Sequence, residues 1–132
     1  MDRSVLILRA EGLALGCAAT ALYATTGVSW WLFAPLALVP DLFMAGYALG
    51  PRIGAAIYNA VHSTLAPLTL AALAYGWGAT IVLAVALVWL AHVGFDRALG
   101  YGLKLPEGFR HTHLGTVGGA DGDAAYLRKQ ST

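Results

Sequence analysis

The sequence predicts an all-α integral membrane protein, a four-helix up-down-up-down bundle with both termini in the cytoplasm. Its 132 residues are 58% hydrophobic and only 11% charged, whereas a soluble domain is about 25% charged. Four apolar runs of about 20 residues, each long enough to cross roughly 30 Å of hydrocarbon, are separated by short turns. All eight Lys and Arg residues fall on one side of this topology.

The predicted spans lie within one domain, residues 1–115, at residues 5–24, 30–49, 53–75 and 79–99. In the first span, Glu11 and the three runs that follow favour a retained helix over a cleaved signal peptide. Trp30 and Trp31 begin the second span as an interfacial aromatic pair. Pro51 precedes the third span and suits the first residue of a helix. Beyond the fourth span, the polar residues 116–132 predict a flexible cytoplasmic tail.

The basic residues predict the orientation of the chain. The turns after the first and third spans contain neither Lys nor Arg. The positive-inside rule therefore places the other side in the cytoplasm, with N-in and C-in in the inner (plasma) membrane. The lipid bilayer is the expected partner, and the lack of a basic stripe gives no indication of nucleic-acid binding.

Four ionisable side chains from three predicted spans fall at similar depths. At 1.5 Å per residue, Asp41 lies roughly 13 Å from the cytoplasmic end of its helix. On the same scale His62 lies about 16 Å from that side, His92 about 12 Å and Asp96 about 6 Å. Such groups are costly in hydrocarbon and usually face the bundle interior or a wet cavity. We therefore expect the four to converge on one site.

Three interpretations of this site remain open. Two imidazoles and two carboxylates, Asp41, His62, His92 and Asp96, can bind a divalent metal such as zinc, manganese or iron. The same groups could form a proton relay in a carrier or channel-like oligomer, or a satisfied structural network across helices. If the protein is an enzyme, the metal would support hydrolysis of an anionic or membrane substrate. The sequence contains no HExxH, GxSxG, P-loop or CxxC motif that would decide whether the protein is an enzyme.

Other polar residues are expected to surround the four or to contact a substrate: Glu11, Tyr58, Asn59, Arg97, Lys104, His111 and His113. Arg97 and Lys104 would steer an anionic substrate. Pro67 has no N–H to donate to the carbonyl of Ser63, which leaves a backbone acceptor free near His62.

Glycines at four-residue spacing predict close helix packing. Gly12 and Gly16 form one such pair, and Gly46, Gly50 and Gly54 repeat the spacing. Small residues at this spacing let two helix backbones approach each other. The packing is expected within one chain or in a homo-oligomer.

The segments that contain these residues resemble a bacterial family of short four-helix membrane proteins of unknown function. The resemblance covers about residues 9–115 and depends on Pro40-Asp41, on the segment from Tyr58 to His62, on HxGxDRxLGYGLK at residues 92–104 and on THLG at residues 112–115. It implies the four-helix fold. It also implies that the following residues fall in the characteristic segments of the family: Asp41, Asn59, His62, His92, Asp96, Arg97, Lys104 and His113. It implies no particular activity, substrate or cofactor.

Overall fold

The computed structural model describes residues 2–117, and its helical architecture confirms the all-α prediction. The helices are α1 (Arg3–Thr25), η1 (Trp30–Leu32), α2 (Phe33–Leu42), η2 (Phe43–Leu49), α3 (Pro51–His62), α4 (Leu65–Gly76) and α5 (Thr80–Leu99). A short antiparallel hairpin of β1 (His111–Thr112) and β2 (Gly115–Thr116) follows. Only the first two residues of the predicted tail, 116–132, fall inside the described part.

Three segments are long and apolar enough to cross a membrane: Arg3–Thr25, Trp30–Leu49 and Thr80–Leu99. Large apolar side chains stand on their outer faces, among them Leu13, which is 51% exposed, and Leu38, which is 64% exposed. Soluble monomers rarely expose large contiguous apolar patches. These faces suit contact with lipid.

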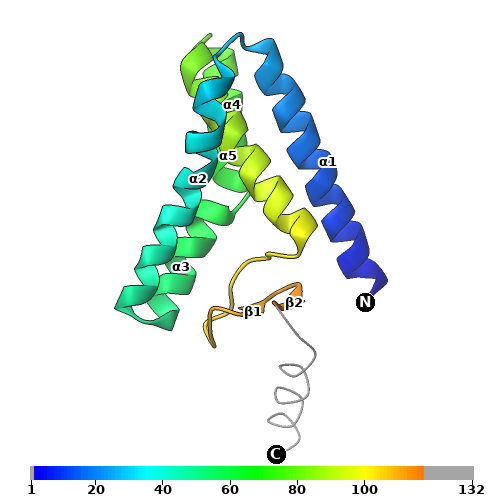
Figure 1. Ribbon diagram of the computed structural model, residues 1–132, viewed down its shortest axis with the longest axis vertical. Helices are drawn as coiled ribbons and strands as arrows, with labels where there is room; N and C mark the ends of the chain where they lie inside the picture. Colours follow the sequence, from blue (N-terminus) through cyan, green and yellow to red (C-terminus); the bar gives the residue numbers. More distant parts are fainter. Residues whose placement is uncertain (1, 118–132) are drawn as a thin grey trace, which may run out of the picture.

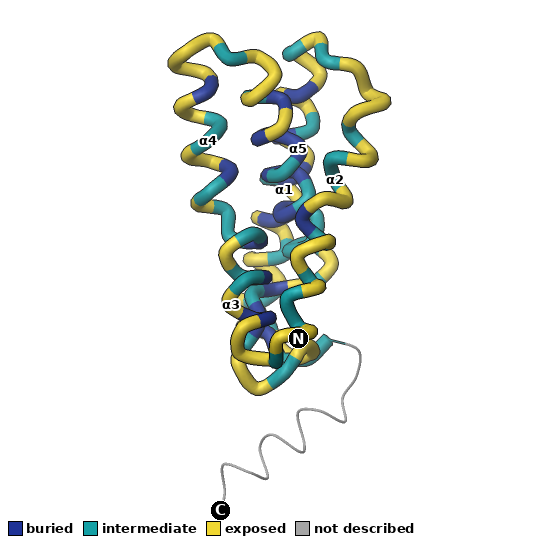
Figure 2. Tube along the Cα trace, turned by 90° about the vertical axis from the view of Figure 1, so that its left-hand side faces the viewer, coloured by how far each residue is buried: buried dark blue, intermediate teal, exposed yellow. Residues whose placement is uncertain are grey.

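The segments run alternately up and down, and α5 is the helix around which the others pack (Figure 1). It contacts α1, α2 and α4, while α3 packs against η2. Most residues of α5 from Ala84 to Gly94 are buried, and Figure 2 shows this helix as the darkest part of the trace. The start of α1, the η2–α3 junction, the end of α5 and the hairpin share one end of the bundle, which we call the hairpin end.

Close packing of α1 on α5 depends on three glycines. A Cβ at Gly94 would lie 2.5 Å from the backbone nitrogen of Gly16, and one at Gly12 would lie 2.8 Å from the carbonyl oxygen of Gly94. No Cβ fits at such distances without displacing a backbone. The predicted pairing of Gly12 and Gly16 thus operates inside the chain, and association of copies through glycine faces stays a prediction.

The apolar core lies on α1 and α5, with Tyr23 as its largest side chain. Tyr23 is fully buried, and its hydroxyl donates to the carbonyl of Ser29 at 2.7 Å. Its ring meets those of Trp30 and Phe33 edge-on or nearly so, with centroids 4.9 and 5.1 Å away. A buried Tyr needs a partner for its hydroxyl, and here the partner is the carbonyl of Ser29. Together with the ring contacts, this hydrogen bond joins the end of α1 to the start of the second segment.

The third predicted span, residues 53–75, is not one continuous helix. Helix α3 ends at His62, Ser63 adopts an extended conformation with ψ of 143°, and α4 begins at Leu65. The side chain of Ser63 accepts a hydrogen bond from the N–H of Leu65 at 3.1 Å. Pro67 explains the location of the break, because a continuous helix would require an N–H at this position to bond the Ser63 carbonyl.

Candidate metal site

Three helical segments contribute the four side chains that we call the His–Asp cluster. Asp41 lies in the last turn of α2, His62 is the last residue of α3, and His92 and Asp96 are one turn apart on α5. One ligand atom from each residue lies within 4.8 Å of the other three. The structure therefore brings together the four side chains that the sequence placed at similar depths.

Five of the six separations among these atoms are close to those of tetrahedral coordination. The Nε2 atoms of His62 and His92 are 3.2 Å apart. Asp41 Oδ1 lies 3.6 Å from His62 Nε2 and 3.4 Å from His92 Nε2, and Asp96 Oδ2 repeats these two distances. Ligands 2.0–2.2 Å from a zinc ion would be about 3.3–3.6 Å apart at the corners of a tetrahedron. The five distances given above lie at or close to this range, and the separation of the two carboxylate oxygens is at most 4.8 Å.

The hydrogen bond behind His62 directs an unprotonated nitrogen atom into the cluster. His62 Nδ1 lies 3.0 Å from the carbonyl oxygen of Tyr58. Because a carbonyl only accepts, Nδ1 carries the proton, and Nε2 of the neutral ring presents a lone pair. The ring of His92 lies near the backbone of Ala37 on α2. Metal-binding histidines are held in this way through their second nitrogen.

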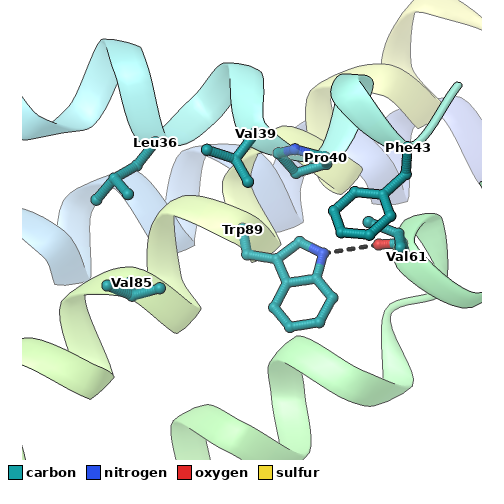
Figure 3. A pocket seen from close by; sticks show the side chains of 7 residues that line it. All are labelled: Leu36, Val39, Pro40, Phe43, Val61, Val85 and Trp89. Carbon is teal, nitrogen blue, oxygen red and sulfur yellow. Dashed lines mark hydrogen bonds between the residues drawn. The ribbon is translucent and has the colours of Figure 1, made fainter. Parts of the chain in front are cut away.

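The break after α3 is stabilised by donors from α5. The indole Nε1 of Trp89 donates to the carbonyl of Val61 at 2.7 Å (Figure 3), and the guanidinium of Arg97 donates to the carbonyl of His62 at 3.3 Å. The last carbonyls of a helix have no partner within it, so a helix that ends between other helices needs such donors. Trp89 is not among the site residues predicted from the sequence, although a helix that ends early demands a donor near its end.

The cluster is buried on its histidine side and open on its carboxylate side. The side chains of His62 and His92 are 3% and 9% exposed, whereas those of Asp96 and Asp41 are 21% and 45% exposed. The two carboxylates border a pocket of about 440 Å³ at the hairpin end. We call it the hairpin pocket, and its lining residues are Asp41, Met44, Tyr58, Asp96, Tyr101, Lys104 and Phe109.

Lys104 contributes a positive charge to the hairpin pocket. Its Nζ lies 4.1 Å from the ring centroid of Phe109, 5.0 Å from that of Tyr58 and 6.0 Å from that of Tyr101, within the range of cation–π attraction. Among residues 2–117 it forms no ion pair with a carboxylate. Burial lowers the pKa of Lys104, an effect that the charge of Asp96 partly opposes.

Two other residues hold this arrangement in place. Asn59 donates through Nδ2 to the carbonyl of Lys104 at 2.8 Å and accepts the N–H of Lys104 at 2.6 Å. The ring of Tyr58 is stacked on that of His62, with centroids 3.7 Å apart and an angle of 8° between the planes. Tyr58 therefore contacts both the cluster and the cation of the hairpin pocket.

The remaining predicted residues lie outside the cluster. Glu11 is exposed on α1. His111 begins β1, and its buried Nδ1 has no hydrogen-bond partner among the described residues. His113 accepts the N–H of Leu103 at Nδ1, at 2.9 Å, and connects the hairpin to the chain after α5. Burial, with the nearby charge of Arg97, lowers the pKa of His113.

These observations define a helical bundle with three segments long and apolar enough to span a membrane and with a partly open His–Asp cluster. The chain belongs to the family described as "Domain of unknown function (DUF4260)", whose profile matches residues 5–117. No curated protein and no solved structure matches the chain. The family assigns no chemistry, so a function must be argued from the site.

Proposed function

We propose that the protein is a multi-pass membrane protein whose His–Asp cluster binds one divalent metal ion and supports metal-assisted hydrolysis at the membrane surface. The supporting observation is the convergence of acceptor atoms. Two imidazole lone pairs and two carboxylate oxygens face one another at 3.2–3.6 Å. Acceptors packed so closely repel one another unless a cation lies between them.

The spacing and ligand types favour zinc over manganese or iron. Nitrogen and carboxylate ligands at tetrahedral separations suit zinc, whereas oxygen-rich octahedral sites suit manganese. The exposure of Asp41 leaves the carboxylate side accessible to water and substrate. Because four protein ligands fill a tetrahedral site, a water would have to enter as a fifth ligand on this open side. A metal ion there would polarise a substrate oxygen and lower the pKa of that water, which are the two effects that metal-assisted hydrolysis needs.

Metal content of the purified chain tests this proposal. The full chain in detergent is equilibrated with Zn²⁺, Mn²⁺ or Fe²⁺ and freed of unbound metal. The metal bound per chain is then measured by inductively coupled plasma mass spectrometry. We expect about one zinc ion per chain, lost in His62→Ala and in His92→Ala. His111→Ala is the matched control, because this histidine lies in the hairpin outside the cluster. Absence of metal from every preparation would overturn the proposal.

The proton-carrier alternative draws on the same short contact. Two Nε2 atoms 3.2 Å apart can share one proton in place of a metal ion. That function predicts proton flux in proteoliposomes that Asp41→Asn reduces, whereas the metal site predicts no flux. If metal binding and flux are both absent while cluster variants lower stability, the cluster is structural.

For the membrane orientation, we propose that the hairpin end faces the cytoplasm. The basic residues that flank the spans support this, because Lys and Arg accumulate on the cytoplasmic side. Reporter fusions after residue 132 test it. A C-terminal phosphatase that is active only in the periplasm should be inactive, and an active one would reverse the assignment.

A further inference from the structure

A second hollow begins beside the His–Asp cluster and extends away from the hairpin end. It has a volume of about 210 Å³, and we call it the apolar groove (Figure 3). Every lining residue is apolar or aromatic: Leu36, Val39, Pro40, Phe43, Val61, Val85 and Trp89. Val39, Phe43 and Val85 are exposed on the outer surface, so the groove opens where lipid would contact the bundle.

The groove begins beside the cluster and extends away from the hairpin end. On the second segment, Leu36, Val39 and Pro40 of the groove precede Asp41 of the cluster, and Phe43 of the groove lies between Asp41 and Met44 of the hairpin pocket. On α5, Val85 and Trp89 line the groove and precede the cluster residues. At 1.5 Å per residue, the groove extends about 10 Å from His92 to Val85, away from the hairpin end.

This order matches the order of parts in a lipid of the adjacent leaflet. There an acyl chain points toward the bilayer centre and the headgroup toward the surface, with the ester linkages between them. We propose that the substrate of the metal site is a lipid with an anionic headgroup, its chain in the apolar groove and its headgroup beside Lys104. This inference rests on the proposed function, because it names the substrate class of that same site.

The charges favour an anionic headgroup. A divalent ion would neutralise the carboxylates of Asp41 and Asp96, which leaves the charge of Lys104 without a partner among residues 2–117. Aromatic rings hold this cation in place, and Asn59 fixes its backbone. An apolar groove on one side and a fixed cation in the neighbouring hairpin pocket complement a molecule with an apolar chain and an anionic headgroup.

Trp89 allows binding to be measured directly, since its ring forms one wall of the groove. Trp30, Trp31 and Trp77 are replaced by Phe, so that Trp89 is the one fluorescent Trp of the chain. The zinc-equilibrated protein is placed in phosphatidylcholine vesicles that contain a small fraction of phosphatidylglycerol. The acyl chains of one lipid or the other carry bromine, which quenches Trp fluorescence on contact.

We expect brominated phosphatidylglycerol to quench Trp89 with about a fivefold preference over brominated phosphatidylcholine at equal mole fraction. Lys104→Gln should abolish the preference, and Arg52→Gln, which removes an exposed cation at the start of α3, should preserve it. Val85→Phe should reduce quenching by filling the groove. Val82→Phe, a matched change outside the groove lining, should have no effect.

The outcomes separate this inference from the metal site, because metal content is measured on the same sample. A chain that holds zinc but shows no lipid preference overturns the lipid inference alone. A chain that holds no metal but shows a preference dependent on Lys104 overturns the metal site and supports the lipid assignment. Loss of the preference on addition of soluble glycerol 3-phosphate would overturn the lipid inference, because the headgroup alone would then be recognised.

Discussion

The side-chain amide of Asn59 pairs with both backbone polar groups of Lys104, at 2.8 Å and 2.6 Å. One side chain thus acts as a strand partner for a segment 45 residues further along the chain. The contact joins α3, which ends in the cluster residue His62, to the chain that provides the cation of the hairpin pocket.

Loss of this amide should therefore detach the segment around Lys104. Asn59→Ala removes two hydrogen bonds and should lower the free energy of unfolding by about 2 kcal/mol. Hydrogen exchange of the Lys104 amide should become faster, and Asn59→Asp, which keeps the acceptor, should show a smaller effect. Thr25→Ala is the control, because its hydroxyl bonds only within α1. Unchanged exchange at Lys104 in Asn59→Ala would contradict the contact.

A methyl group at Gly94 should separate α1 from α5. Overpacking of a tight contact costs about 1–3 kcal/mol, so Gly94→Ala should lower the thermal midpoint in detergent. Gly76→Ala is the matched control, because a Cβ at Gly76 meets no atom within 4 Å. Equal midpoints for the two variants would show that α1 and α5 do not approach each other so closely.

The donor from Trp89 should stabilise the break between α3 and α4. Trp89→Phe preserves an aromatic ring but leaves the carbonyl of Val61 without its donor, which costs about 1–3 kcal/mol for a buried acceptor. Titration with a denaturing detergent should show this loss. Trp77→Phe, at a position 79% exposed, should unfold like the unsubstituted chain. If the two variants behave alike, the hydrogen bond contributes nothing to stability.

Acid should loosen the hairpin through His113. The lowered pKa means that the folded hairpin favours the neutral ring, which accepts the N–H of Leu103. This contribution to stability is present above the unfolded pKa of about 6.5 and is lost as the pH falls toward the folded pKa. Hydrogen exchange at Leu103, corrected for its intrinsic pH dependence, should accelerate in that window.

A His113→Phe variant separates the histidine from other acid effects. Its Leu103 amide should exchange at a corrected rate that does not change with pH, whereas His111→Ala should keep the pH dependence. Arg97 lies near His113 and opposes its protonation. A pH dependence that persists in His113→Phe would place the responsible group elsewhere.

The helical fold and the level of the cluster follow from local features of the sequence. Apolar runs of about 20 residues predict spans, and the rise of a helix sets the height of Asp41 and His92 on neighbouring spans. The missing N–H of Pro67 pointed to a free carbonyl at Ser63, although not to a full break of the helix. These features depend on residues a few positions apart, which a sequence displays directly.

The parts that escaped prediction depend on contacts between distant segments. The aromatic rings around Lys104 come from α3 and from the chain after α5, so they meet only once the hairpin has folded back. The hydrogen bond from Trp89 to the carbonyl of Val61 forms only because α3 ends at His62 and its end lies beside α5. Glu11 has a suitable height but faces outward, and height alone does not reveal which way a side chain points.

The link of Ser63 and Thr64 lets the two halves of the third segment follow different neighbours. Helix α4 packs on α5, whereas α3 packs on η2. Successive residues of an α-helix are rotated by about 100° about the helix axis. One residue added within α3 would therefore turn the imidazole of His62 away from the carboxylates of the cluster. One residue added at the link could be absorbed by extended chain. The break at Ser63 and Thr64 therefore keeps the direction of the His62 side chain independent of changes in length in α4, the half of the third segment farther from the hairpin end.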